Sequence, residues 1–93
     1  MDYSTDLLKE IEKEASEMMN PREISALLDI DELSLVDDIN TIGNPARKAF
    51  FRGVATTVHE IRKDVRDTAM AGSPYAIDAC QKQIMNILSE VQI

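Results

Sequence analysis

Residues 44–91 read NPARKAFFRGVATTVHEIRKDVRDTAMAGSPYAIDACQKQIMNILSEV. Asn44 is a good helix N-cap, and Pro45 has the fixed φ suited to a first helical position. Gly72-Ser73-Pro74 combines a C-terminal cap, an N-cap and a second helix-initiating proline. The stretch therefore predicts two helices, residues 45–71 and 74–91. A turn this short predicts that they form an antiparallel hairpin.

The predicted helix of residues 45–71 separates its side chains into faces. At roughly 100° per residue, one face is apolar and another carries a broad basic stripe. The apolar face consists of Phe50, Val54, Val58, Ile61 and Val65, flanked by Phe51 and Ala69. The stripe consists of Lys48, Arg52, His59, Arg62, Lys63 and Arg66. It is either an ordinary solvated surface or a surface that meets phosphates or an acidic protein.

Three shorter helices are predicted before this hairpin. Apolar residues recur at helical spacing over residues 5–19, with charged residues on the opposite face. Asn20-Pro21 then starts a second helix, in which Glu23 is placed for a capping box and Leu27 and its apolar neighbours point inward. Asp31 caps a third helix of about nine residues, and Gly43 is a natural stop.

The second and third of these helices are joined by about three residues, and together they have the outline of a helix-turn-helix. The predicted fold class is therefore all-α, with a helix-turn-helix-like N-terminal bundle over residues 1–43 and the long helical hairpin over residues 44–93. With 93 residues in total, the two parts form a single domain.

Charge is distributed unevenly along the chain. The net charge is −7, but residues 1–42 hold three basic and twelve acidic side chains, a balance of −9. Residues 43–93 hold seven basic and five acidic side chains, a balance of +2. The acidic half argues against simple adsorption to nucleic acid or anionic lipid, because long-range repulsion weakens both.

The chemical groups that catalysis needs are few. The chain has one histidine, His59, which we expect on the surface, and one cysteine, Cys80, which we expect to be buried. No calcium loop, zinc-binding cysteine pair or phosphate-binding glycine loop is present, so we predict no catalytic residue, metal or cofactor. No apolar run is long enough to span a membrane, and the first residues do not resemble a signal peptide, which predicts an intracellular protein with no membrane partner.

Two stretches resemble the small terminase subunits of tailed bacteriophages and prophages. The first comprises Ala49-Phe50-Phe51-Arg52-Gly53, then Glu60-Ile61-Arg62, then the corner Ala69-Met70-Ala71-Gly72-Ser73-Pro74-Tyr75-Ala76-Ile77. It is similar to the family's aromatic-basic-glycine step, its Glu-x-Arg helix and its Ala-x-x-Gly-Ser-Pro-x-Ala corner. The second is Glu23 to Asp31, similar to the first helix and turn of many helix-turn-helix modules. The corner is also a good helix–turn–helix joint in any hairpin.

The resemblance implies a non-catalytic DNA-packaging protein in the cytoplasm of a bacterial host. It implies a homo-oligomer that helps bind double-stranded viral DNA and regulates the large terminase subunit. The hairpin would build the oligomer, through Phe50, Phe51, Val54, Val58, Ile61, Ile84 and Leu88. Any positive charge for DNA would come from Arg22, Arg47, Lys48, Arg52, Arg62, Lys63 and Arg66.

The predicted third helix departs from the pattern of a DNA-reading helix. Residues 31–40 hold Asp31, Glu32, Asp37 and Asp38 but no Lys or Arg. A recognition helix normally brings hydrogen-bond donors and positive charge to the groove, and four carboxylates repel phosphate. Two alternatives therefore stay open: an acidic helical adaptor that binds another protein, and a helix-turn-helix transcriptional regulator.

Overall fold

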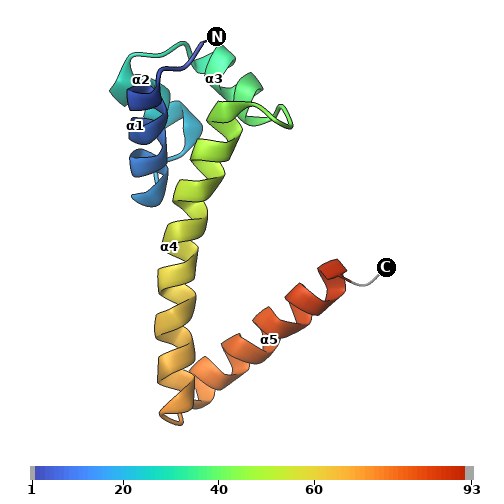
Figure 1. Cartoon of the computed structure of the whole chain (residues 1–93). Coiled ribbons are helices and arrows are strands. Elements are labelled where there is room, and N and C mark those ends of the chain that lie inside the picture. Colours follow the sequence, from blue (N-terminus) through green and yellow to red (C-terminus); the bar gives the residue numbers. More distant parts are fainter. Residues whose placement is uncertain (1, 92–93) are drawn as a thin grey trace. The chain divides into compact units, whose positions relative to one another are not determined.

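The computed structural model describes residues 2–91, in which five α-helices occur and no strand. The helices are α1 (Thr5–Ser16), α2 (Pro21–Leu28), α3 (Glu32–Ile39), α4 (Pro45–Met70) and α5 (Pro74–Val91) (Figure 1). The all-α prediction is confirmed. The chain divides into two compact units, unit 1 (Met1–Val58) and unit 2 (His59–Ile93). Helix α4 contributes its first part to unit 1 and its last part to unit 2.

The predicted helix starts agree with the structure because the capping side chains are in place. Asn20 accepts a hydrogen bond from the Glu23 backbone N–H at 2.9 Å, and the Glu23 side chain accepts one from the Asn20 N–H at 3.0 Å. This reciprocal pair satisfies two N–H groups that a helix start leaves without partners. Asp31 caps α3 in the same way, accepting from the Ser34 N–H at 2.9 Å.

The end of α1 corrects a prediction. The helix stops at Ser16, three residues before the predicted end, because Met18 adopts a left-handed conformation with φ 68°. The Met18 N–H then donates to the Ala15 carbonyl, and the Met19 N–H to the Glu14 carbonyl. This is a Schellman ending, which usually has glycine at the left-handed position. The sequence offers no glycine there, so apolar periodicity alone extended the predicted helix too far.

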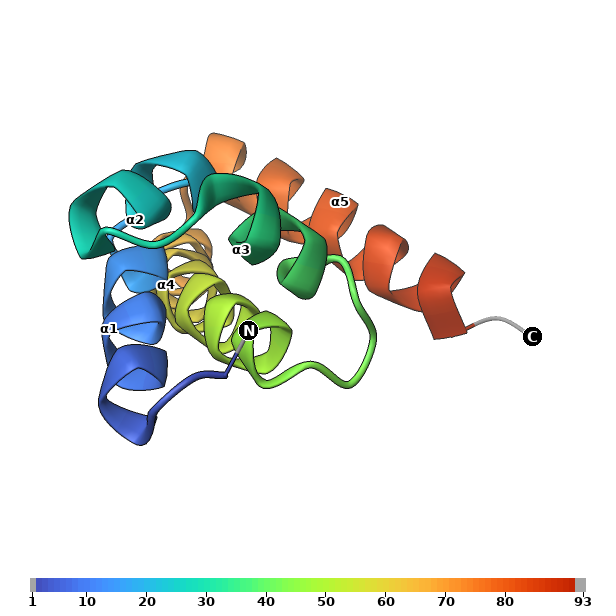
Figure 2. The same ribbon diagram turned by 90° about the horizontal axis from the view of Figure 1, so that it is seen from above.

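The core of unit 1 forms where α1, α2 and α3 gather around the beginning of α4 (Figure 2). Its buried residues are Ile11, Ala15, Ile24, Leu35, Ile39, Ala46 and Ala49. The partly buried hydrophobic residues packed against them include Tyr3, Leu28, Phe50 and Val54. The prediction that Leu27 points inward is wrong, because 59% of that residue is exposed. Only one side of the short helix α2 reaches the core.

Helices α1 and α4 approach each other closely at Gly53, which is buried. A Cβ atom built at this glycine would lie 2.2 Å from the backbone oxygen of Glu12 and 2.8 Å from the Ala15 Cβ. One turn further along α4, the Thr57 hydroxyl donates to the Ser16 carbonyl oxygen at the end of α1. The small residues of α4, rather than its Phe and Val stripe, therefore make the most buried contact with α1.

Unit 2 contains the turn between α4 and α5 and buries far fewer residues than unit 1. Its predicted turn is present: Gly72 has φ 100°, and the Ser73 side chain accepts from the Ala76 N–H at 3.4 Å. Beyond this turn, α5 leaves the last part of α4 at an open angle (Figure 1). Among the residues of unit 2 described by the structure, only Ala76 is buried. A closely packed antiparallel hairpin is thus not confirmed for the isolated chain.

Candidate interaction surfaces

Three of the predicted DNA-binding arginines make contacts within unit 1. Arg47 donates to the Ile39 carbonyl oxygen at 2.8 Å, and its guanidinium lies 4.8 Å from the centre of the Phe51 ring. Arg22 pairs with Glu32 at 3.0 Å, and Arg52 lies 3.8 Å from a carboxylate oxygen of Glu12. Arg47 therefore closes the end of α3, and the other two partly neutralise acidic neighbours.

The remaining predicted basic residues lie on exposed parts of α4. Lys48, Arg62 and Lys63 have no ion pair within residues 2–91, and Arg66 lies 3.5 Å from its neighbour Asp67. Because that pair is exposed on both sides, it contributes little to stability. These four side chains are available to a partner, with Lys48 in unit 1 and the other three in unit 2.

An apolar groove lies within unit 2, between the last part of α4 and α5. Its volume is about 400 Å³, and its lining consists of Arg62, Val65, Arg66, Ala79, Cys80, Gln83, Ile84 and Ile87. Arg62 and Arg66 both line the groove and are exposed residues. Cys80 was expected to be buried, and it is half-buried in the lining of this groove.

The residues predicted for oligomerisation divide between the two units. Phe50 and Val54 pack against the core of unit 1, and Val58 is half-buried. Phe51 remains 47% exposed, with its ring edge-to-face against Phe50 at 5.5 Å. In unit 2, about half of the surface of Ile61, Ile84 and Leu88 is exposed.

Exposed apolar side chains are concentrated in unit 2. They are Ile61, Met70, Tyr75, Ile77, Ile84, Met85, Ile87 and Leu88, each 40–89% exposed. On α5, Ile84 and Ile87 line the groove, whereas Ile77, Met85 and Leu88 lie outside its lining. Helix α5 thus exposes apolar residues to more than one side, which is unusual for a surface helix with a single buried stripe.

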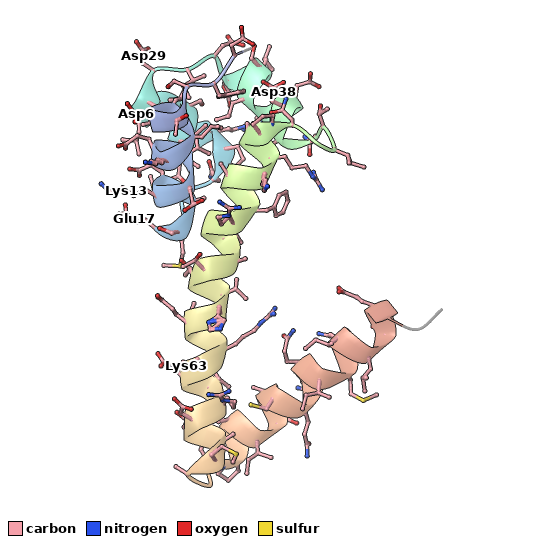
Figure 3. The ribbon with its side chains drawn as sticks, viewed as in Figure 1. Asp6, Lys13, Glu17, Asp29, Asp38 and Lys63 are labelled. Atoms are coloured by element: carbon pink, nitrogen blue, oxygen red, sulfur yellow. The ribbon has the colours of Figure 1, made fainter. Side chains whose placement is uncertain are left out.

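The outer surface of α3 is acidic, and most of its carboxylates have partners. Asp38 accepts a hydrogen bond from the Tyr3 hydroxyl at 2.6 Å, while Asp31 and Glu32 are held by Ser34 and Arg22. The Ser34 backbone N–H and hydroxyl stabilise the ionised form and lower the pKa of the Asp31 carboxyl. Burial and the adjacent Asp38 raise the pKa of the Tyr3 hydroxyl. Figure 3 labels Asp6, Glu17, Asp29 and Asp38 at separate places on unit 1, so its acidic side chains are not confined to α3.

Asp37 differs from the other three carboxylates of α3, because within the described chain its side chain has no hydrogen bond or ion pair. One turn earlier, Leu33 is 80% exposed. Both line a shallow hollow with Ser34, Val36 and Asn40. The sequence predicts the carboxylates of α3 but not the pairing of Leu33 with Asp37, because it does not show which face of α3 is buried.

Residues 2–91 contain no group of three or more His, Cys, Asp or Glu side chains arranged to hold a metal ion. His59 is exposed, as expected. No helix in the described part of the chain combines the length and apolar character needed to cross a bilayer.

No protein-family model, curated protein or solved structure matches this chain.

Proposed function

We propose that the chain is a non-catalytic assembly protein of the small-terminase type, whose copies associate through unit 2. The observation that carries this proposal is the set of exposed apolar side chains on α5 and the end of α4. A monomer would leave this surface in water, and α5 would have little to hold it against α4. Packing of unit 2 against other copies would cover both sides of α5 and hold this helix in place.

The free energy gained by burying these side chains, compared with the free energy lost on association, favours several shared contacts over a single small one. Complete burial of an Ile, Leu or Met side chain is worth about 1.5–3 kcal/mol, so burying the exposed half contributes about 1 kcal/mol each. The seven exposed Ile, Leu and Met side chains of unit 2 supply about 7 kcal/mol, which lies toward the lower end of the about 4–15 kcal/mol lost on association. A closed ring, in which each copy contacts two others, offsets this cost more effectively than an open dimer.

In this proposal, DNA contact comes from lysines of α4 rather than from α3. The carboxylates of α3 would repel phosphate, so α3 is a poor candidate for insertion into a groove. Lys48 and Lys63 are exposed and without ion pairs within the described residues. Each contributes weakly, but a multimeric array makes every further phosphate contact intramolecular. The large terminase subunit is the partner that the motif resemblance adds.

Solution mass tests the assembly role. Light scattering and native mass spectrometry should detect a multimer, and Leu88→Asp should shift it to the monomer by placing a charge on the apolar side of α5. Ser89→Asp is the matched control, because this exposed neighbour forms no part of the apolar set and its substitution should leave the mass unchanged. A wild-type chain that is monomeric at every concentration would rule out the proposal.

Salt dependence tests the DNA role separately. Affinity for duplex DNA should fall with salt by about 0.9 log units per log unit of salt for each phosphate contacted. Replacing Lys48 and Lys63 with Ala should reduce both affinity and slope without changing the mass. An unchanged slope would exclude these lysines from DNA contact.

The acidic surface of unit 1 favours one other candidate, a monomeric adaptor that binds a basic protein. Residues 1–58 hold six basic and twelve acidic side chains, a balance of −6. A monomer that does not bind DNA at low salt would support this adaptor, whereas a stable dimer that binds one DNA sequence would support a transcriptional regulator.

A further inference from the structure

Two exposed surfaces of the described residues have complementary chemistry, although Arg66 on one of them also lies 3.5 Å from Asp67. The first is the outer side of α3 in unit 1, where Leu33 is 80% exposed and the Asp37 carboxylate lies one turn away without a partner among the described residues. The second is the groove of unit 2, which has an apolar lining and two arginines along one side. One surface offers an apolar side chain beside a negative charge. The other offers an apolar floor beside positive charges.

The dimensions of the two surfaces also agree. Helix α3 has eight residues and is therefore about 12 Å long at 1.5 Å per residue. The α5 side of the groove extends from Ala79 to Ile87, which covers about 12 Å on the same rule. Arg62 and Arg66 are four residues apart on α4, so they lie on the same side of the helix one turn apart. One carboxylate placed between them would contact both guanidinium groups.

We propose that α3 of one copy docks in the groove between α4 and α5 of the next copy. Leu33 enters the apolar groove beside Ile84 and Ile87, and the Asp37 carboxylate accepts charge-assisted hydrogen bonds from Arg62 and Arg66. This inference rests on the proposed assembly and adds the partner of this particular groove. It also assigns a role to α3, whose negative charge argues against its insertion into a groove of DNA.

The contact joins two different surfaces of the same chain, so it is heterologous. Each copy offers one α3 and one groove, and a row of copies leaves one of each unfilled at its ends. Closure into a ring fills every groove, whereas a rotation that does not close gives a filament. This contact differs from association through Ile77, Met85 and Leu88, the exposed residues of α5 outside the groove. Docking of α3 depends on ion pairs and weakens as salt screens them.

Charge reversal provides the central test. Asp37→Arg should weaken assembly about tenfold in apparent dissociation constant, and so should Arg62→Glu combined with Arg66→Glu. The triple variant with all three changes should regain assembly, because it restores opposite charges. Glu10→Arg is the matched control: Glu10 is an exposed carboxylate of α1, and reversing it changes the net charge as much as Asp37→Arg does. Folding of every variant is checked by circular dichroism.

Cys80 reports directly on the groove, since it is the only cysteine of the chain and lines this surface. Its rate of reaction with a chromogenic aromatic disulfide should fall several-fold as wild-type protein is concentrated from nanomolar to micromolar. In Leu33→Ser the rate should stay constant over the same range. Because Leu33 is 80% exposed, its replacement should change the stability of the folded chain little.

The outcomes separate this inference from the proposed function. Assembly with the Asp37, Leu33 and arginine variants all indistinguishable from wild type would overturn the docking of α3 but leave the assembly role intact. A groove protected in a monomer at all concentrations would mean that the chain fills its own groove, which overturns both the docking between copies and the assembly role. A fully reactive monomer at all concentrations would overturn both proposals.

Discussion

Replacing Gly53 with alanine tests the close approach of α1 and α4 in unit 1. The added Cβ would lie 2.2 Å from the Glu12 backbone oxygen, 2.8 Å from the Ala15 Cβ and 3.0 Å from the Ser16 nitrogen. Two of these three atoms belong to the backbone of α1, so no side-chain rotation can relieve the contact. Helix α1 must move away from α4 by about 1 Å or more to restore ordinary contact distances.

The expected magnitude follows from two opposing effects. Alanine favours a helix interior over glycine by about 1 kcal/mol, which would stabilise α4 if space were available. Overpacking of a core costs about 1–3 kcal/mol and more where backbone must move. Displacement of α1 also loosens Ile11 and Ala15 and weakens the Thr57–Ser16 hydrogen bond. We therefore expect a net loss of about 2 kcal/mol, or about 8–16 °C in Tm.

Urea denaturation followed by circular dichroism measures this loss, and Ala55→Gly provides the contrasting control. Ala55 is an exposed position of the same helix, two residues away. Its change to glycine should cost only the propensity difference of about 1 kcal/mol. A Gly53→Ala variant as stable as wild type, or more stable, would show that α1 does not approach α4 at this position.

Three further predictions concern local features of the fold. Met18→Gly should stabilise unit 1 by about 0.5–1 kcal/mol in urea denaturation, because glycine relieves the left-handed strain of a residue that is 76% exposed. Gly72→Ala should lower stability by about 1–2 kcal/mol and increase hydrogen exchange around the turn, although no atom lies within 4 Å of the new Cβ, because φ is 100°. Tyr3→Phe should cost about 0.5–1.5 kcal/mol near neutral pH through the lost bond to Asp38. Since the folded state holds the Tyr3 proton, wild-type stability should also fall as pH rises above about 10, and Tyr3→Phe should reduce this fall.

Helix number and helix starts could be predicted from the sequence because they depend on local chemistry. The Asn20 capping box and the Asp31 cap need only residues within one turn, and proline at position 21, 45 or 74 marks a first helical position. The end of α1 could not be predicted in this way. Its left-handed residue is a methionine instead of the usual glycine, so no residue type in the sequence marks the end of this helix.

The faces of α4 were harder to assign than its limits. Hydrophobicity ranks Phe and Val above Ala and Gly, so the sequence pattern emphasised Phe50, Val54 and Val58. The most buried positions are instead Ala46, Ala49 and Gly53, which permit α1 to approach the helix. A row of small residues at helical spacing is the signal that would have identified this contact. Arg47 is a similar case. The sequence predicts that it contacts DNA, but its guanidinium donates to the Ile39 carbonyl oxygen and lies over the Phe51 ring.

The two units differ in how much apolar surface they bury, and this difference bears most directly on function. Unit 1 buries a core and leaves an acidic exterior, whereas unit 2 buries little and leaves an apolar one. An isolated pair of helices with an open groove gains too little from burial to offset the entropy of ordering α5. The stability of unit 2 is therefore expected to depend on protein concentration, while that of unit 1 is not. If α5 melts at the same temperature over a thousandfold range of concentration, its order does not come from other copies, and an internal source of stability must be sought.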